Sequence, residues 1–518
     1  MSSSITRRDF LNGLSLTIAG GLAPLELMAA KARAAAGPAY PPALTGLRGM
    51  TNAAFEVIHG VAREGRRYSI DALPVAESYD LIVVGAGIAG LTAAWRYAER
   101  HPEARILVID NNDDFGGHAR RCELDVPGGT LLGYGGSESM VSPRTKYAGE
   151  LKAVIDKLGI DPERFYDEGV FHRALYPKLG LSRGVFFDAE TFGADRLVTG
   201  DPLLLGFDEF APDNPNARPI EAFLADCPLD GVTREGLAQL FAGTKDYLAH
   251  QDKELKLKHT ARISYRDFLL HVCNLPETAV SFFQGRLHDN YGLGIDAIAA
   301  QDAMSDGLPG AAAIGIEDSF ESHGDEPYVH HFPDGNATLA RAMVASLVPS
   351  ATAARAIEDI VTSRFDYGKL DEATNRVRIR LQATAVAVRN EAAGNGDGVS
   401  VGYVKDGALV RVRGNKVVVA TFAAVVPHIC NELPAPRAEY FASNVRLPLL
   451  YIKVALRNWE SFARLGVHKI AGPMSFLSTV KLDYPVSVGA YKFAATPAEP
   501  VGLQLVHVPL AQNQGHDA

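Results

Sequence analysis

The sequence predicts an α/β protein in which a Rossmann-like dinucleotide-binding domain is interleaved with a second, α+β domain. Three observations support this fold class. A short apolar run, residues 79–84, leads into a glycine-rich turn and a helix-forming stretch, 91–100. A second apolar run, 106–109, follows at the distance expected of a βαβ unit. From Arg376 onward, after a long helical region, the hydrophobic period becomes that of strands.

The turn after the first apolar run has G-x-G-x-x-G spacing, with Gly85, Gly87 and Gly90. The first glycine allows a tight turn, the second lets the backbone approach a pyrophosphate, and the third lets the helix pack on the strand. Asp110 ends the second run about twenty residues later, where its carboxylate can accept hydrogen bonds from ribose hydroxyls. Two asparagines follow it, and no arginine stands there for a 2′-phosphate, so the pattern disfavours NADP.

Two further glycine pairs favour FAD over NAD. Residues 114–121, DFGGHARR, place bare backbone where it can lie along a ribityl-phosphate. Residues 131–139, LLGYGGSES, offer a second bare segment suited to a flat isoalloxazine ring. These loops are similar to those of the large FAD-dependent amine oxidase group, which implies an FAD-binding domain of the glutathione-reductase and amine-oxidase type. The expected cofactor contacts in them are Gly116, Gly117, His118, Gly135 and Gly136.

The composition indicates a globular protein with two domains. The chain has 518 residues, too many for one ordinary core, with 47% hydrophobic and 22% charged residues. A formal net charge of −10 and a pI near 5.9 argue against nucleic acids and anionic membranes as partners. The same charge is compatible with a cationic substrate.

The first 36 residues resemble a twin-arginine export signal. Arg7 and Arg8 precede Phe10 and a modest apolar stretch that Pro24 interrupts, so the stretch is too short to span a bilayer. Alanines between positions 32 and 36 offer A-x-A cleavage sites. We therefore expect a periplasmic protein, exported by the twin-arginine machinery, with no stable membrane span.

Cysteine spacing argues against a thiolate metal site. There is no C-x-x-C pair, so neither a clustered zinc site nor a covalent c-type haem is predicted, and no metal ligands are assigned. Free buried thiols are expected rather than disulfides. The four cysteines are Cys122, Cys227, Cys273 and Cys430.

The chain is expected to divide into interleaved segments. Helical periodicity and proline-bearing loops fill residues 144–300, and the apolar run 416–421 resembles a strand that returns to the flavin. The substrate would then sit where the two domains meet. The expected segments are an export signal (1–36), an N-terminal extension (37–78), two parts of the FAD-binding domain (79–143 and 331–425), a mainly helical substrate domain (144–330), and a substrate-domain sheet with a tail (426–518).

Long motifs are similar to those of the bacterial spermidine dehydrogenase family. The resemblance implies oxidation of a spermidine-like polyamine by hydride transfer to FAD, hydrolysis of the imine to aldehyde and amine, and an unidentified electron acceptor other than NAD. The motifs are RRDFLNG (7–13), YPPALTGLRG (40–49), LYPKLGLSRGVFFDAETFG (175–193), HFPDGNATLARAM (331–343) and VALRNWESFARLGVHKI (454–470).

The same family is described as carrying haem beside FAD, so the resemblance also implies a b-type haem. The sequence does not choose a ligand, since a lone histidine is more often structural. The candidates are His59, His172, His288, His330 and His331.

Amine oxidation requires carboxylates or aromatic faces for distal ammonium groups, and an apolar wall that favours the neutral amine. We expect Glu138, Asp289 and Asp296 to bind charge. Tyr291 is the candidate aromatic wall, and His288 is the candidate proton acceptor. For each residue, ordinary capping of a turn is the alternative.

Further contacts are expected where the chain re-enters the nucleotide domain. Val386 and Thr421 are predicted at the cofactor, and Asp334, Gly335 and Asn336 are predicted to cap a helix near it.

Related flavoenzymes close the nucleotide domain with a C-terminal strand, glycine turn and helix, which this chain is expected to lack. We therefore expect weakened FAD retention. Three functions stay open: a polyamine dehydrogenase; a flavin oxidoreductase for another amine, an amino acid or a desaturation target; and an inactive, truncated remnant.

Overall fold

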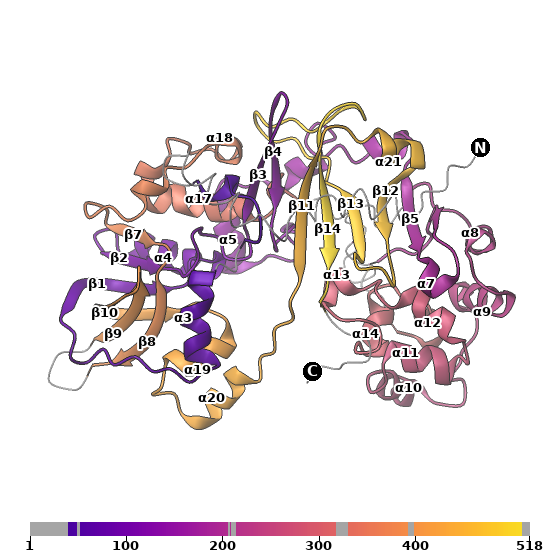
Figure 1. Cartoon of the computed structure of the whole chain (residues 1–518), viewed down its shortest axis with the longest axis horizontal. Helices are drawn as coiled ribbons and strands as arrows, with labels where there is room; N and C mark the ends of the chain where they lie inside the picture. The colour runs from indigo at the N-terminus through magenta and orange to yellow at the C-terminus, as the bar shows by residue number, and fades with distance from the viewer. Residues whose placement is uncertain are drawn as a thin grey trace.

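Two six-stranded sheets organise the molecule and lie side by side in Figure 1. The computed structural model describes residues 40–48, 52–205, 208, 214–316, 330–391 and 398–509, so the expected export signal lies outside the described residues. The first sheet has the order β7-β2-β1-β10-β9-β8, and the second has the order β11-β14-β13-β12-β5-β6.

The first sheet contains the predicted βαβ unit. β1 pairs in parallel with β2 and β10, β2 pairs in parallel with β7, and α4 connects β1 to β2. The Rossmann-like α/β fold class is thereby confirmed. The strands are β1 (Val75–Val84), β2 (Ile106–Ile109), β7 (Val377–Arg380), β8 (Thr384–Asn390), β9 (Val399–Lys405) and β10 (Ala408–Val419).

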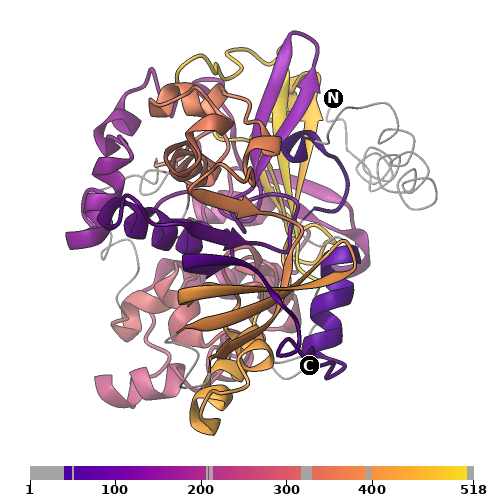
Figure 2. The same cartoon turned by 90° about the vertical axis from the view of Figure 1, so that its left-hand side faces the viewer.

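Both faces of this sheet are covered, so residues 81–84 of β1 and all of β2 are apolar and buried. Along β1, Leu81 and Val83 face one core, whereas Ile82 and Val84 face the other. Helices α4 (Ile88–Arg100) and α17 (Ala337–Leu347) pack on the first face. Helix α3 (Asn52–Ala62) packs beside β8 on the second, as Figure 2 shows with α3 in indigo beside the orange strands.

The predicted strand at 416–421 is part of a longer strand. Residues 416–419 form the end of β10, which begins at Ala408. Its first half pairs antiparallel with β9, and most of its length pairs in parallel with β1. Because β10 has neighbours on both sides, it can run on unbroken from the meander into the parallel part of the sheet.

The second sheet joins distant parts of the sequence. Its strands are β5 (Ser182–Phe187), β6 (Arg196–Thr199), β11 (Leu450–Leu456), β12 (Val467–Ala471), β13 (Thr479–Leu482) and β14 (Val501–His507). A separate hairpin of β3 (Arg121–Val126) and β4 (Gly129–Tyr134) follows the second glycine loop.

Helices flank the second sheet on the side away from the first, to the right in Figure 1. Ser264 caps the short helix that follows it, since its Oγ accepts a hydrogen bond of 3.0 Å from the amide of Asp267. The remaining helices are α5 (Gly149–Lys157), α6 (Leu175–Lys178), α7 (Ala189–Phe192), α8 (Ile220–Asp226), α9 (Gly231–Ala242), α10 (Lys253–Thr260), α11 (Tyr265–Asp267), α12 (Glu277–Phe283), α13 (His288–Tyr291), α14 (Ala300–Ser305), α15 (Ala311–Ile314), α18 (Ile357–Thr362), α19 (Val426–Ile429), α20 (Ala435–Ala442) and α21 (Glu460–Leu465).

The cap predicted at residues 334–336 differs in detail. Asn336 is the N-cap residue of α17, but its side chain makes no capping hydrogen bond. Its Nδ2 donates instead to Ser137 Oγ and to the Ser139 carbonyl, each at 2.9 Å. The side chain of Asn336 therefore bonds the loop after Gly136 instead of an amide of its own helix. These two hydrogen bonds hold the start of α17 against that loop.

All four cysteines are free, and Cys227 and Cys273 are buried. Across the described parts of the chain, no helix has the length and apolar character needed to cross a membrane. The same residues contain no cluster of three or more His, Cys, Asp or Glu suited to a metal ion.

Candidate functional site

Two glycines of the first turn, Gly85 and Gly90, leave no room for a side chain. Gly85 has φ +114°, and a Cβ there would lie 2.4 Å from the Ala420 carbonyl oxygen. A Cβ on Gly90 would lie 1.9 Å from the Gly85 carbonyl oxygen. Both positions therefore require glycine so that strand, turn and helix can meet, as the spacing predicts.

The second glycine loop lies directly against the first turn. The amide of Gly116 donates to the Ala86 carbonyl at 2.8 Å. Gly117 has φ +62°, and a Cβ there would lie 3.0 Å from the Cα of Gly87. Two stretches of bare backbone thus run side by side, which is the surface a pyrophosphate and its ribityl chain need.

The carboxylate of Asp110 hydrogen-bonds the backbone of the first glycine turn. Its Oδ2 accepts from the Ala86 amide at 2.7 Å, and its Oδ1 accepts from the amide and the Nδ2 of Asn112 at 2.8 and 2.9 Å. Burial raises the pKa of Asp110, and these hydrogen bonds act against that rise. Three of about four acceptor positions of the carboxylate are already used, so one is left for the predicted ribose contact.

The third glycine pair continues the line of bare backbone. A Cβ on Gly136 would lie 3.7 Å from the Cβ of His118, and one on Gly135 would lie 3.0 Å from the Cβ of Arg120. The His118 ring stacks on Phe422 with centroids 5.5 Å apart. Burial, Arg446 and Arg120 lower the pKa of His118, so the ring is neutral near pH 7.

The two remaining predicted contacts occupy different environments. Thr421 follows the C-terminal end of β10 and donates through Oγ1 to the Phe422 carbonyl at 3.4 Å. Val386 is buried in the apolar cluster that also holds Val84 and Ile109, the residues just before Gly85 and Asp110. Thr421 therefore lies at the turn itself, whereas Val386 lies within the core beneath it.

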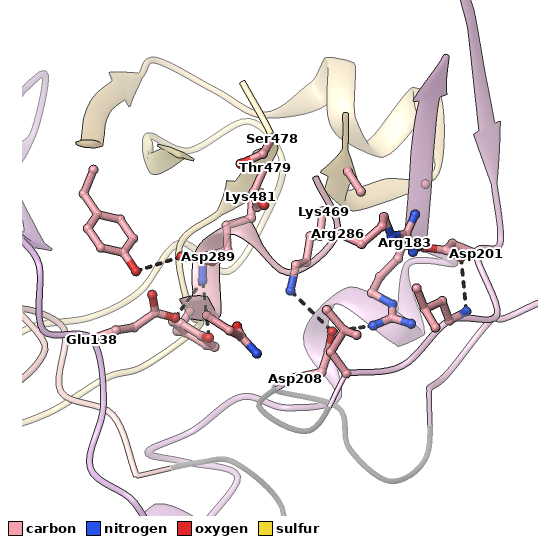
Figure 3. A pocket seen from close by; sticks show the side chains of 17 residues that line it. Glu138, Arg183, Asp201, Asp208, Arg286, Asp289, Lys469, Ser478, Thr479 and Lys481 are labelled. Atoms are coloured by element: carbon pink, nitrogen blue, oxygen red, sulfur yellow. Dashed lines mark hydrogen bonds and ion pairs between the residues drawn. The ribbon is translucent and has the colours of Figure 1, made fainter. Parts of the chain in front are cut away.

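Two residues beyond Gly136, Glu138 enters the wall of a cavity of 250 Å³ (Figure 3). Strands β5, β12, β13 and β11 of the second sheet supply one wall, and α13 contributes another part. The lining residues are Glu138, Arg183, Gly184, Asp201, Leu203, Leu205, Asp208, Arg286, Asp289, Asn290, Tyr451, Lys469, Ala471, Ser478, Thr479, Lys481 and Tyr484.

Glu138 forms an ion pair with Lys481, with Oε1 and Nζ 2.6 Å apart. Burial alone would raise the pKa of Glu138, but Lys481 and His331 outweigh burial and lower it to about 2. Glu138 is therefore ionised and already paired. Glu138 lines the cavity, but its carboxylate is already paired with Lys481 and is not vacant for a cationic substrate.

Three further ion pairs occupy the other end of the cavity, at the right of Figure 3. Arg183 pairs with Asp208, and Lys469 Nζ lies 3.3 Å from the same Oδ2 of Asp208. Arg286 pairs with Asp201. Burial would raise the pKa of Asp208, but Arg183 and Lys469 outweigh it and hold the pKa below its usual range.

Asp289 differs from the other cavity carboxylates. Its Oδ1 accepts a hydrogen bond of 2.7 Å from the Tyr451 hydroxyl, a neutral donor. Among the described residues, no lysine, arginine or histidine forms an ion pair with it. Asp289 is thus the carboxylate in this cavity that is left to bind an incoming ammonium group.

The other predicted catalytic residues do not line this cavity in the described structure. Burial and His507 lower the pKa of His288 to about 4 although Asp296 acts to raise it, so His288 is neutral near pH 7. Tyr291 packs against the helical core and hydrogen-bonds Asp306, and Asp296 accepts from Gln284 Nε2 at 2.6 Å. Of the segment 286–296, Arg286, Asp289 and Asn290 reach the cavity.

Several cavity residues were not predicted from the sequence. Lys469 and Lys481 are single lysines inside the short apolar strands VHKIA and TVKL. A charged residue that interrupts an apolar strand is the signal that could have identified them, since buried charges need partners. Their partners lie far away in sequence, so the pairing itself could not be predicted.

The candidate haem ligands differ in whether their ring nitrogens already have hydrogen-bond partners. Both ring nitrogens of His172 have partners, the Glu168 carbonyl and Ser487 Oγ, each at 2.7 Å. His331 is buried between the rings of Tyr134 and Tyr484, at 4.9 and 4.2 Å, and neither ring nitrogen has a hydrogen-bond partner among the described residues. The haem and its ligand stay predictions.

Comparison with known proteins places one segment in a family of domains. Residues 83–158 match the NAD(P)-binding Rossmann-like domain family. A thiamine thiazole synthase of Aeropyrum pernix is 60% identical over 38 residues, which are 7% of this chain and 13% of that protein. The domain match covers the glycine turn and the strand that ends at Asp110, and it agrees with the geometry of the turn.

Similar solved structures cover more of the chain at low identity. A putrescine oxidase bound to putrescine is 14% identical, with a TM-score of 0.45 over 84% of this chain and 76% of that one. Cyclohexylamine oxidase from Brevibacterium oxydans IH-35A is 15% identical, with a TM-score of 0.43 over 83% and 75%. A putative protoporphyrinogen oxidase from Exiguobacterium sp. 255-15 is 12% identical, with a TM-score of 0.43 over 83% and 77%.

Proposed function

We propose that this chain is an FAD-dependent oxidoreductase that oxidises an amine, and that spermidine-like polyamines are the substrate class implied by the family resemblance. One observation supports the proposal above all. Bare backbone runs from the nucleotide turn at Gly87 and Gly117, past His118 and Gly136, to a cavity that holds Asp289. A dinucleotide lying along this backbone would bring its far end toward the cavity.

The residues present fit FAD. The approach of Gly117 to Gly87 leaves no space for a Cβ, and Asp110 keeps one acceptor position for a ribose hydroxyl. Gly135 and Gly136 would face the ring, with Thr421 on the opposite loop. When bound, FAD would accept the hydride that leaves the carbon next to the amine nitrogen.

The chain's own residues then bind and orient the amine. Asp289 would hold an ammonium group, with Tyr451 fixing its carboxylate at 2.7 Å. The Tyr484 ring, which lines the cavity, would supply an aromatic face. The product imine is hydrolysed by water to aldehyde and amine. His288 lies outside the lining, so a proton role for it would require an intervening water.

The cellular setting belongs to the same proposal. The twin-arginine pattern at residues 1–36 supports export to the periplasm with folded protein as cargo. Electrons would then leave through an acceptor other than NAD. A b-type haem, implied by the resemblance, is one relay for them, and His331 is a candidate ligand, since both of its buried ring nitrogens are without a hydrogen-bond partner in the described structure.

The decisive experiment is to purify the chain without residues 1–36 and record its absorbance. Because FAD retention is expected to be weakened, we expect weak oxidised flavin bands that added FAD strengthens, and we expect spermidine to bleach them under anaerobic conditions more effectively than a panel of other amines. Flavin bands that no amine bleaches would overturn the amine assignment. A colourless protein that also fails to bind added FAD would instead favour the inactive remnant.

A further inference from the structure

One arginine just after the second glycine pair leaves most of its donors unused. Among the described residues, the guanidinium of Arg120 makes one hydrogen bond, in which Nε donates to the Gly117 carbonyl at 3.1 Å. The side chain is only 11% exposed, and its Nη1 is buried without a hydrogen-bond partner. A guanidinium carries five N–H donors, and leaving a buried charged donor unmatched is costly. Arg120 therefore suits a ligand with several acceptor oxygens.

The carboxylates nearest to Arg120 are engaged with other groups. Asp113 Oδ1 lies 3.9 Å from Arg120 Nη1, too far for a hydrogen bond, and accepts instead from Arg48 Nη2 at 2.9 Å. Asp114 accepts from the Tyr367 hydroxyl at 2.6 Å. Burial raises the pKa of Asp114, and Tyr367 and Arg120 act against that rise. Within the described structure, no carboxylate hydrogen-bonds the Arg120 guanidinium.

Arg120 is connected to the nucleotide turn through Gly117. The carbonyl of Gly117 accepts from Arg120, and a Cβ on Gly117 would lie 3.0 Å from the Cα of Gly87. Gly87 is the N-cap residue of α4, a helix of 13 residues, and it makes no side-chain cap. The guanidinium and the positive end of the helix dipole thus lie at the same stretch of bare backbone. Both favour a negatively charged ligand there.

The neighbouring basic side chains do not replace Arg120. Burial, Arg446 and Arg120 lower the pKa of His118, so its ring is neutral near pH 7. Arg446 is exposed, whereas Arg121 is buried and forms an ion pair with Asp334 at 3.2 Å. Arg120 is therefore the buried cation of this loop whose donors are left for a ligand.

We infer that the guanidinium of Arg120 binds the diphosphate of FAD beside the N-terminus of α4. Diphosphate oxygens are the acceptors that a planar guanidinium fork matches. This inference rests on the proposed function and adds a cofactor-binding residue to it. A diphosphate held at Arg120 and the glycine turn would fix the middle of the cofactor, so that its ring end extends toward Gly136 and the cavity.

The test separates the diphosphate from the rest of the cofactor by comparing ADP with adenosine. The two probes share adenine and ribose, and only ADP carries a diphosphate. Calorimetric titration of the mature protein, freed of flavin, gives a dissociation constant for each probe. We expect Arg120→Gln to weaken ADP binding at least about tenfold and adenosine binding less than about threefold, because the charge-assisted contact to the diphosphate is lost.

A second variant, Arg120→Lys, keeps the charge and removes the planar fork. We expect it to weaken ADP binding less than Arg120→Gln does, since an ammonium still attracts the diphosphate as a point charge. It also serves should Arg120→Gln not fold, which thermal unfolding shows. Fluorescence titration with FAD should rank the wild type and the two variants in the same order as ADP.

The matched control is Arg376→Gln, which removes the same charge from a side chain that is 58% exposed and 3.8 Å from Glu103. The affinities of this variant for ADP, adenosine and FAD should equal those of the wild type. A loss of ADP affinity as large as that of Arg120→Gln would show that net charge alone is responsible, and it would overturn the inference.

The remaining outcomes separate this inference from the proposed function. If FAD does not bind the wild type but ADP binding depends on Arg120, the proposed function is wrong and the diphosphate site stands. If FAD binds the wild type and both Arg120 variants equally, the diphosphate site is overturned and the proposed function stands. ADP that binds the wild type no more tightly than adenosine, or an equal loss of both probes in Arg120→Gln, also overturns the site.

Discussion

At the scale of single residues, the cavity is defined by buried charges and by what each one touches. Lys481 has a side chain that is only 3% exposed, and its ammonium contacts Glu138 at 2.6 Å and the Tyr484 hydroxyl at 3.5 Å. Desolvating such a pair is costly, and breaking it leaves an uncompensated charge. The pair therefore matters as much for stability as for the chemistry of the cavity.

Replacing Glu138 by Gln should lower the free energy of unfolding by about 3–5 kcal/mol, because buried Lys481 loses its counter-ion. Replacing both residues, Glu138→Gln with Lys481→Met, should recover most of that loss. Urea unfolding at pH 7 measures both effects. The control Glu254→Gln breaks an exposed pair with Lys258 and should cost less than about 0.5 kcal/mol. Equal losses in the two single variants would contradict the prediction.

The Glu138–Lys481 pair also predicts how the free energy of unfolding changes with pH. The pKa of Glu138 in the folded protein is about 2, below its ordinary value of 4.5. Its contribution to stability is therefore complete above pH 4.5 and is lost as the pH falls toward 2. The stability difference between wild type and Glu138→Gln should shrink over this range.

His331 gives a second, separate pH prediction. Burial lowers its pKa to about 3, assisted by Lys453 and Lys481 and opposed by Glu138. Neutral His331 thus contributes stability that is complete above pH 6.5 and is lost as the pH falls toward 3. Since one proton corresponds to about 1.4 kcal/mol per pH unit, the plot of unfolding free energy against pH between 6 and 4 should be flatter by that amount in His331→Phe. An unchanged slope in His331→Phe would contradict the prediction.

At the scale of elements, the junction of β1 and α4 decides whether a dinucleotide can bind. The helix begins immediately after Gly87, and its third residue is Gly90. The helix amides at this end point toward the expected pyrophosphate and favour negative charge. Any side chain that separates helix from strand would move these amides.

Gly90→Ala should therefore impair both stability and FAD binding. Its Cβ would lie 1.9 Å from the Gly85 carbonyl oxygen, so α4 must shift. We expect a loss of about 3 kcal/mol, near the upper range for overpacking, and a protein that copurifies with little flavin. The control is Gly231→Ala at the start of α9, where no atom lies within 4 Å of the added Cβ. A Gly90→Ala protein with full flavin content would refute this account.

At the scale of the whole molecule, one loop links the nucleotide turn to the cavity. It extends from Gly135 through Glu138, is held by Asn336 of the first domain, and contacts Lys481 of the second sheet. A dinucleotide that rests on this loop would therefore touch both halves of the protein.

FAD should accordingly stabilise the molecule as a whole. At a free concentration about 100 times Kd, binding should add about 2.7 kcal/mol to the free energy of unfolding. Thermal unfolding with and without added ligand measures the effect. NAD and NADP, which lack the isoalloxazine, should raise the midpoint less than FAD. A larger shift with NAD than with FAD would reject the cofactor assignment.

Much of the first sheet could be predicted because its signals are local. The apolar runs that became β1 and β2, the glycines between them and Asp110 lie within about thirty residues, and each acts on its immediate neighbours. The parallel pairing of β10 with β1 could not be predicted from such local signals, because the two strands lie far apart in the sequence. The domain boundaries and the individual cofactor contacts stay predictions.

The amino-acid sequence by itself determined the dinucleotide-binding turn, since glycine spacing and apolar runs dictate backbone geometry wherever they occur. The sequence also indicated Glu138 and Asp289 as candidates for binding a cationic substrate. Only the tertiary structure decided that Glu138 is paired with Lys481, that Asp289 has no cationic partner among the described residues, and that Arg286 lines the same cavity at its other end. Charge pairing depends on distance in space, and strand register brings together side chains almost 300 residues apart, as with Arg183 and Lys469.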